Sequence, residues 1–202
     1  MTQDFNTEEK ILDAAEQVFQ RKGFNGARMQ EIADRAEINK GLLHYYFKTK
    51  DKLFEAVFSK AFDLMVNRLN AIISTQHTLD DKIDKMVDTY MNMLIKHPHL
   101  PLFVINELNR HPDEFINKVL TKKRRPNVQA LLDAIQHEIE HGNIRPFPPK
   151  QLIINIIGLC IFPFVARPMI QVLLDADNPE FQKMIEERKT LIADFVKSAL
   201  RP

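Results

Sequence analysis

Apolar residues recur three and four positions apart along almost the whole chain, and the strict alternation of apolar and polar residues that marks a strand is missing. This spacing puts apolar side chains on one face of a helix. Only five glycines interrupt the 202 residues. The pattern therefore predicts an all-α protein whose helices are joined by short connections.

The first predicted helix has recognisable signals at both ends. It is expected to begin near Asn6 or Thr7, since either side chain can accept a hydrogen bond from a free backbone amide of the first turn. Gly23 is placed to adopt the left-handed conformation that closes a helix, and Phe24 can then fold back onto Phe19.

Two short helices follow, separated by residues 37–39. The first of them turns isoleucine and alanine side chains inward. The next is predicted from Lys40 to about Phe47, with Asn39 as its capping residue.

A fourth and much longer helix is predicted after Thr49, which can cap it. Its apolar stripe continues to Ile73 and is too long for the small bundle before it to cover. We therefore expect this helix to join two domains, at residues 1–52 and 53–202.

The rest of the chain is also predicted to be helical. The expected helices cover residues 78–97, 101–108, 112–123, 128–141, 152–166 and 178–199. The run 152–166 is apolar nearly all round, but a membrane span takes roughly 20 apolar residues and Pro163 interrupts this one. Since the last helix is also strongly apolar, we expect self-association through the two C-terminal helices, with plain core packing as the alternative.

Charge is unevenly placed along the chain, although the total is only +1. Residues 1–37 hold five Lys or Arg against eight acids, a net charge of −3. Residues 38–53 hold four lysines against Asp51, a net charge of +3. Any nucleic-acid role must therefore come from local charge placement rather than from the overall charge.

This cationic stretch coincides with a pattern typical of DNA-binding proteins. A short helix, a three-residue connection and a second short helix after a supporting helix predict a helix-turn-helix, whose second helix enters the major groove. His44 and Tyr45 can donate hydrogen bonds to phosphate oxygens. Lys50 lies at the start of the fourth helix, where free backbone amides favour an anion, and Lys48 adds charge beside it.

The same segment resembles the DNA-binding domain of TetR/AcrR-type regulators. The residues in register are Ile11, Ala15, Phe19, Gly23, Ile32, Ala33, Ala36, Lys40, Gly41, Leu43, Tyr45, Phe47, Lys50 and Leu53. The resemblance implies a homodimeric transcriptional regulator with an N-terminal three-helix DNA-binding domain, a long joining helix, and a helical ligand-binding and dimerisation domain. The last two long helices of each chain would together form a four-helix dimer interface.

The resemblance also assigns roles to single residues. By position, Asn39, His44, Tyr45 and Lys50 match residues that touch phosphates, and Lys40, Gly41 and Leu42 match residues that face bases. Two departures stand out. Glu37 occupies a turn position where the family usually has glycine, which implies strain of about 1 kcal/mol if φ is positive there. Ala27 and Arg28 replace the threonines that usually cap the second helix, so Arg28 either leaves that helix uncapped or contacts phosphate instead.

The expected partners are a double-stranded, roughly palindromic DNA operator and a small apolar or amphipathic inducer that releases a repressor. Bulky side chains with few polar atoms suit such an inducer pocket. The candidates are Met86, Tyr90, Met93, Phe103, Phe162 and Phe164. Plain core packing is the alternative interpretation for each of them.

Residues 137–141 spell H-E-x-x-H, a zinc-peptidase pattern. On a helix, His137 and His141 lie on the side opposite the apolar stripe, and no histidine follows to supply the third ligand that catalytic zinc needs. We therefore expect no metal, no cofactor and no enzymatic activity.

Three further features have ordinary interpretations. Cys160 sits in an apolar run, which is typical of a core position and suits a reducing compartment. The run TKKRR at 121–125 is interpreted as the end of a loop, with a second nucleic-acid patch as the alternative. The N-terminal residues have no export signal, so a cytoplasmic protein without a membrane role is expected. A helical ligand-binding or adaptor protein without DNA activity remains the alternative function.

Overall fold

The computed structural model describes residues 2–110, 112–119 and 125–202, and within these ranges every regular element is a helix. The prediction of an all-α fold is confirmed. Contacts divide the chain into two compact units, 1–63 and 64–202, which meet inside one long helix. The functional boundary expected between residues 52 and 53 stays a prediction.

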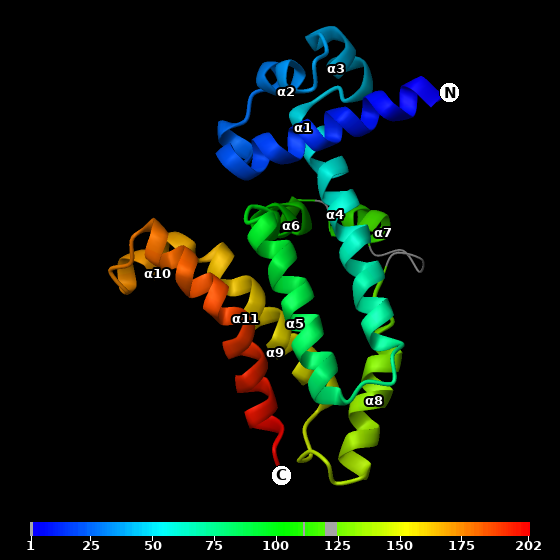
Figure 1. The fold of residues 1–202 in the computed structure, drawn as a ribbon, viewed down its shortest axis with the longest axis vertical. Coiled ribbons are helices and arrows are strands. Elements are labelled where there is room, and N and C mark those ends of the chain that lie inside the picture. The colour runs from blue at the N-terminus through cyan, green and yellow to red at the C-terminus, as the bar shows by residue number, and fades with distance from the viewer. Residues whose placement is uncertain (1, 111, 120–124) are drawn as a thin grey trace. The chain divides into compact units, whose positions relative to one another are not determined.

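The first unit is a small bundle around aromatic and aliphatic side chains (Figure 1). Its helices are α1 (Thr2–Gly26), α2 (Met29–Arg35), α3 (Lys40–Tyr46) and the first part of α4 (Lys50–Ile73). The Phe19 ring stacks on Phe24 with centroids 6.2 Å apart and meets Phe54 of α4 edge-on at 4.9 Å. Such aromatic pairs add to the hydrophobic burial that holds α1 and α4 together.

The predicted end of the first helix is confirmed, but its predicted start is wrong. Gly23 has φ 68°, the left-handed conformation, and divides α1 at a kink. Helix begins at Thr2, ahead of Asn6, because residues 2–6 contain no Pro or Gly and each added residue extends the hydrogen-bonded ladder.

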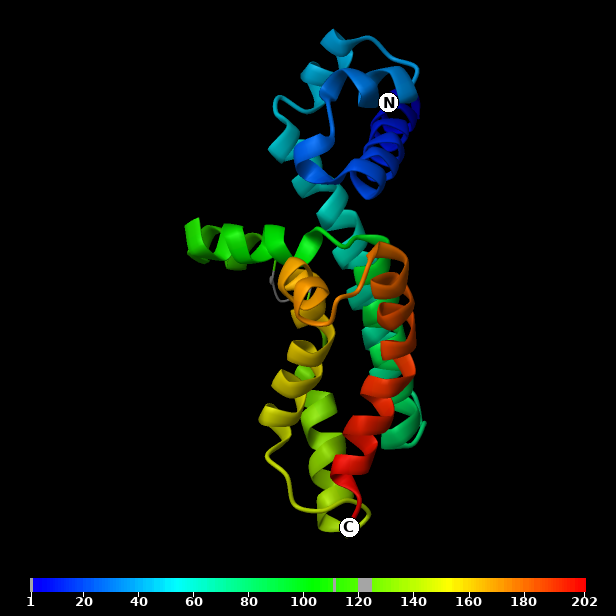
Figure 2. The ribbon, with the colours of Figure 1, turned by 90° about the vertical axis from the view of Figure 1, so that its left-hand side faces the viewer.

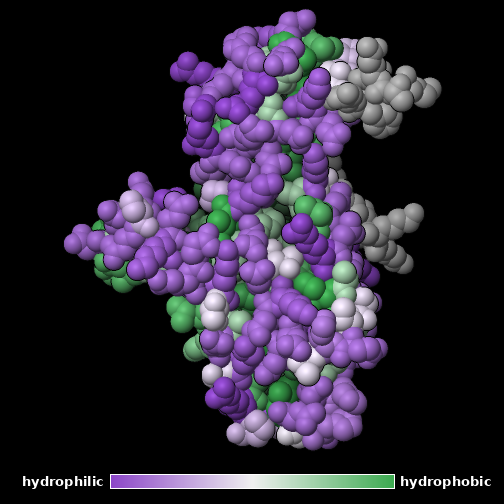
Figure 3. Space-filling model, viewed as in Figure 1, coloured by the Kyte–Doolittle hydropathy of each residue, from purple (hydrophilic) through white to green (hydrophobic). Residues whose placement is uncertain are grey.

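The second unit is built around α5, which packs against α8, α9 and most extensively α11 (Figures 1 and 2). Its helices are α5 (Leu79–Lys96), α6 (Leu100–Arg110), α7 (Pro112–Val119), α8 (Val128–Glu140), α9 (Pro149–Val165), α10 (Arg167–Leu173) and α11 (Asn178–Leu200). Val87 and Met91 of α5 are fully buried. Apolar side chains also reach the surface of this unit, among hydrophilic ones (Figure 3).

Local signals define the ends of two of these helices. The Thr78 hydroxyl accepts a hydrogen bond from the Asp81 amide at 3.2 Å and begins α5. Gly142, with φ 71°, follows α8. These groups satisfy backbone donors or let the chain turn where the helical ladder ends.

The separate helix α10 was not predicted from the sequence. It bends by 78° from α9 at Ala166, because Pro168 near its start has no amide donor and restricts the residue before it. Among the described residues, no single helix is both long and apolar enough to cross a membrane, and only α9 and α10 taken together pass on length and composition.

Candidate nucleic-acid interface

The predicted recognition helix α3 is anchored by buried side chains and capped at its start. Leu43 is fully buried, and Phe47 just beyond the helix is nearly so. The Asn39 side-chain oxygen accepts a hydrogen bond from the Leu42 amide at 2.8 Å, which confirms Asn39 as the cap. An anchor and a cap together fix the direction in which this short helix presents its outer face.

That outer face carries most of the residues expected to touch DNA. Lys40, Gly41, His44 and Tyr45 are exposed, and Leu42 is half-buried. A side chain at Gly41 would start 3.2 Å from the capping oxygen of Asn39, a tighter approach than most Cβ atoms make. Glycine therefore keeps the backbone of α3 accessible beside its cap.

Tyr45 is the most exposed aromatic residue of this face, with 79% of its surface accessible. Its ring meets that of the half-buried Tyr46 edge-on at 5.5 Å. An exposed tyrosine held by an aromatic neighbour offers a hydroxyl donor at low entropic cost, which suits a phosphate contact.

The Lys50 side chain contacts the protein itself. Its Nζ donates to the Phe24 carbonyl at 2.7 Å and to the Ala27 carbonyl at 3.2 Å, and it lies 4.5 Å from the centre of the Phe24 ring. Carbonyls just past a helix end lack intrahelical partners, so this cation stabilises the α1–α2 corner. These bonds could not be predicted from local sequence signals, since Lys50 is 26 residues from Phe24.

The remaining cations of the segment are exposed. Lys48 lies at the α3–α4 connection, and Arg28 precedes α2 without a side-chain capping bond. Lys52 forms an ion pair with Glu55 at 3.2 Å. The structure thus brings Lys40, His44 and Tyr45 together on α3 and leaves Lys48 and Arg28 on neighbouring connections.

A separate ion-pair cluster fastens α2 to the end of α1. Glu31 accepts hydrogen bonds from Lys22 at 2.7 Å and from Arg21 at 2.5 Å. The Lys22 hydrogen bond is the largest influence, and it lowers the pKa of the Glu31 carboxyl below its usual value. The cluster is exposed, so its contribution is screened by solvent.

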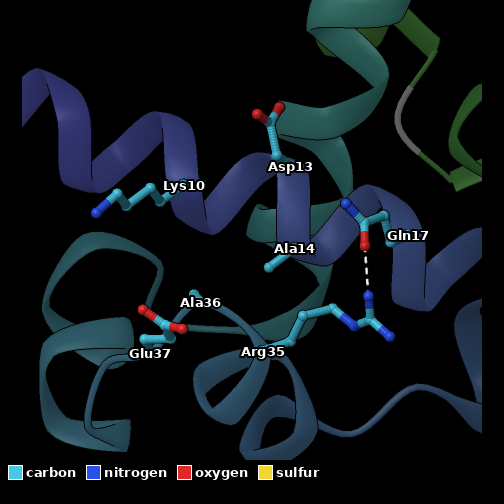
Figure 4. A pocket seen from close by; sticks show the side chains of 7 residues that line it. All are labelled: Lys10, Asp13, Ala14, Gln17, Arg35, Ala36 and Glu37. Carbon is cyan, nitrogen blue, oxygen red and sulfur yellow. Dashed lines mark hydrogen bonds between the residues drawn. The ribbon is translucent and has the colours of Figure 1, made fainter.

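A hollow of about 310 Å³ lies between α1 and the end of α2 (Figure 4). Its lining residues are Lys10, Asp13, Ala14, Gln17, Arg35, Ala36 and Glu37. The Arg35 guanidinium donates to the Gln17 side-chain oxygen, drawn as a dashed line in Figure 4. Because its two cations are balanced by two carboxylates, this hollow has no preference for an anion.

The comparison with protein families decides the identity of this arrangement. The model described as "Bacterial regulatory proteins, tetR family" matches residues 11–57, and that described as "Tetracyclin repressor-like, C-terminal domain" matches residues 80–196. The chain belongs to the TetR family of transcriptional regulators. The first match spans all of α2 and α3, so the resemblance drawn from the sequence is confirmed.

Individual relatives cover nearly the whole chain. The HTH-type transcriptional repressor NicS of Pseudomonas putida is 39% identical over 209 residues, covering 96% of this chain and 92% of that protein. A TetR/AcrR-family regulator from Thermobifida fusca has a TM-score of 0.64 at 16% identity, covering 92% of this chain and 96% of its own. Bacillus subtilis FadR, solved with stearoyl-CoA, has a TM-score of 0.59 at 19% identity, covering 92% and 97%. The two structures establish a shared fold.

Both departures from the usual TetR pattern have structural consequences. Glu37 has φ 56°, so a residue with a side chain occupies the left-handed region where glycine is favoured, and the expected strain is present. Arg28 adopts an extended conformation and provides no capping bond, so α2 starts uncapped by a side chain.

The predicted inducer-contacting residues divide into two groups. Met86, Tyr90, Met93 and Phe164 pack, partly buried, against the core of the second unit, and Phe103 is half-buried with its ring 6.4 Å from Phe115. Phe162 does not join them, because its side chain is 54% exposed on α9. The helical period turns Phe162 away from Cys160 and Phe164, whose side chains point inward.

Burial shapes the chemistry of two polar side chains in this region. It raises the pKa of the Tyr90 hydroxyl above its ordinary value, and it raises the pKa of the Cys160 thiol to about 12. Cys160 is therefore an unreactive thiol at neutral pH. Tyr90 carries the only hydroxyl group among the six residues predicted to contact an inducer.

The two histidines of the H-E-x-x-H pattern are exposed on α8, with ring centres 4.0 Å apart. The described residues contain no group of three His, Cys, Asp or Glu side chains placed to hold a metal. In the TKKRR run only Arg125 is described, and residues 121–124 lie outside the described residues.

Proposed function

We propose that the protein is a homodimeric repressor that binds a palindromic DNA operator and releases it when a small apolar or amphipathic molecule binds the second unit. The observation that carries the proposal is the outer face of α3, where Lys40, His44 and Tyr45 are exposed above the buried anchor Leu43. Cationic and aromatic donors on a recognition helix suit base edges and phosphates.

The proposed contacts divide into two kinds. Lys40, Gly41 and Leu42 lie in the first turn of α3, the part that reaches base edges in a helix-turn-helix, and would read sequence. Asn39, His44, Tyr45, Lys48 and Arg28 would hold phosphates and set the register. For Lys50 we propose a phosphate contact only in addition to its bonds to Phe24 and Ala27, which it makes without DNA.

Pairing of two chains through α9 and α11 is supported by the apolar side chains that these helices expose. Ile154 and Ile157 on α9, and Leu191 and Phe195 on α11, are each at least 43% accessible. Large apolar patches of this kind mark protein interaction sites. Two chains would then present their α3 helices to half-sites about 34 to 36 Å apart, one helical turn of DNA.

Ligand binding is proposed in the second unit, at Met86, Tyr90, Met93, Phe103 and Phe164. Their soft apolar surfaces and the single hydroxyl among them, on Tyr90, fit an amphipathic molecule with a long apolar part. The FadR neighbour, which holds stearoyl-CoA, is an example of this fold with such a ligand. A coupling of about 1 to 3 kcal/mol would weaken operator binding 5- to 150-fold.

The test is selection of bound fragments from the source genome, followed by footprinting. We expect enriched fragments to share an inverted repeat. The Lys40→Ala variant should return a changed consensus, whereas the matched Lys48→Ala variant should return the same consensus with lower affinity. No enrichment by the wild-type protein in low-salt buffer would contradict DNA binding and favour a ligand-binding protein without DNA activity.

A further inference from the structure

One lysine of the second unit is buried. Lys82 lies near the start of α5 and is only 9% exposed, and no other lysine or arginine among the described residues is buried to this extent. Lysine side chains are almost never buried in this way unless their charge is paired. An anion beside Lys82 is therefore expected.

The carboxylates of α5 itself are not placed to supply that anion. They belong to Asp80, Asp81, Asp84 and Asp88. At the helical period, all four lie at least about 100° around the helix from Lys82. Asp84 is already paired with Lys197 of α11 at 2.6 Å. The ion pairs between described residues of the second unit all join other side chains, so the Lys82 ammonium has no carboxylate partner there.

The Lys82 ammonium is nevertheless accessible at its tip. Among the described residues, the one side-chain nitrogen or oxygen that is both sealed from water and without a hydrogen bond is Nε of Arg188. Nζ of Lys82 is not sealed in this way, although its residue is buried. The methylene stem of the lysine is thus buried, while its charged end stays within reach of a small molecule.

Arg188 is a less suitable cation for a ligand, because its guanidinium is used within the chain. Its Nη2 donates to the Leu159 carbonyl of α9 at 2.9 Å. That carbonyl is free to accept because the residue four positions later is Pro163, which has no amide hydrogen. Lys82 is therefore the better placed of the two cations to bind an anion from outside the chain.

Lys82 also begins the row of α5 side chains that is proposed above to contact a ligand. Met86 and Tyr90 follow it at intervals of four residues, and Met93 follows after three more. These four side chains lie within about 80° of one another around the helix, and the row is about 16 Å long. Met86, Tyr90 and Met93 pack, partly buried, against the apolar core. The row therefore has a cation at one end and apolar surface along the rest.

We propose that the ligand of the second unit is an alkyl carboxylate, whose head group binds the Lys82 ammonium and whose chain lies along Met86, Tyr90 and Met93. This assignment rests on the proposed ligand site and specifies the charge and the direction of its occupant. The carboxylate supplies the anion that Lys82 lacks, and the methionine and aromatic surfaces cover the alkyl chain. A neutral molecule of the same shape leaves the lysine unpaired, so the site discriminates against it.

The test compares decanoate with decanol, which have the same number of carbons and differ in the head group, by isothermal titration calorimetry on the 202-residue chain. We expect the wild type to bind decanoate at least about tenfold more tightly than decanol. Lys82→Met removes the charge but keeps a long apolar side chain, so it should abolish this preference and leave decanol binding unchanged. Lys82→Arg should retain the preference.

The matched control is Lys85→Met, on the same helix. Lys85 is exposed, and its Nζ lies 2.6 Å from Nε2 of His77. This variant should keep the wild-type preference for decanoate, because an exposed lysine outside the row has no role in the proposed site.

Two ligands measured on the wild type and on Lys82→Met form a double-mutant cycle. A general loss of packing or stability weakens both ligands and cancels in the cycle. Equal affinity of the wild type for the two ligands, or a preference that survives in Lys82→Met, overturns the carboxylate site and leaves the proposed ligand site in place. Binding of neither ligand by the wild type overturns the proposed ligand site as well.

Discussion

The outer face of α3 and the face of α11 that carries Leu191 and Phe195 are both exposed, but they are built in opposite ways. On α3 the exposed groups include a lysine, a histidine and a tyrosine, which water solvates well, and the apolar anchor Leu43 is fully buried. On α11 the exposed groups are Leu191 and Phe195, and a charged donor of Arg188 is buried without an acceptor. The polar groups of α3 are well solvated in the absence of DNA. In a single chain, by contrast, α11 exposes apolar side chains to water and leaves a buried donor without an acceptor among the described residues.

The sharpest contrast between the two faces comes from one substitution made at two leucines. Leu43→Ala removes a fully buried side chain and should cost about 2 to 5 kcal/mol of unfolding free energy at any protein concentration. Leu191→Ala removes a side chain that is 60% exposed. Its effect should stay within about 0.5 kcal/mol for the isolated chain and grow with concentration as dimers form.

Chemical denaturation at several protein concentrations measures both effects. Equal losses at every concentration would show that Leu191 belongs to the core of its own chain. That result would contradict the claim that Leu43 stabilises the single chain whereas Leu191 stabilises a dimer.

The next largest effect is expected at Lys50. Lys50→Ala removes a cation that is hydrogen-bonded to two backbone carbonyls. We expect it to lower the free energy of unfolding by about 1.5 to 3 kcal/mol, the usual contribution of a charge-assisted hydrogen bond. Lys48→Ala, at an exposed position, should leave the melting temperature unchanged.

Salt titration of DNA binding separates a structural role for Lys50 from a phosphate contact. Loss of one contact flattens the slope of log affinity against log salt by about one unit. We expect this flattening for Lys48→Ala. A flattened slope for Lys50→Ala as well would show that this amine leaves its carbonyl partners when DNA binds, and an unchanged slope would assign it a purely internal role.

A smaller and opposite effect is expected in the turn before α3. Glu37→Gly relieves the left-handed strain at φ 56° and should raise stability by about 0.5 to 1 kcal/mol, after the entropy that glycine adds to the unfolded chain is subtracted. Glu37→Ala keeps a Cβ at the same φ and serves as the control. A gain from alanine equal to that from glycine would show that the glutamate charge, and not the backbone, is responsible.

A stabilising effect of about the same size is expected at the start of α2. Arg28→Ser supplies the capping oxygen that this helix lacks and should add about 0.5 to 1 kcal/mol of stability. If Arg28 contacts phosphate, operator affinity should fall at the same time. Calorimetry measures the stability of the variant, and a binding titration on the same preparation measures its operator affinity. A lower stability would show that Arg28 has a structural partner that serine cannot replace.

Sequence reasoning succeeded where a signal acts within a few residues. The caps Asn39 and Thr49 and the left-handed glycine Gly23 are confirmed, because a cap or a positive φ depends on the residue itself and the next turn. The strain expected at Glu37 is confirmed for the same reason.

Sequence reasoning could not predict the features that depend on residues far apart in the chain. The bonds of Lys50 to the α1–α2 corner and of Arg188 to the carbonyl freed by Pro163 join positions more than twenty residues apart. The exposure of Phe162 follows from which side of α9 faces the core, and an all-round apolar helix carries no periodicity to show that.

The most direct measurement is the number of chains on one palindromic duplex chosen by genomic selection, determined by native mass spectrometry. We expect two chains per duplex, or a multiple of two, and a complex that weakens steeply with salt. A single bound chain, or no complex in low-salt buffer, would contradict the proposal that the α3 face grips DNA as one half of a twofold pair.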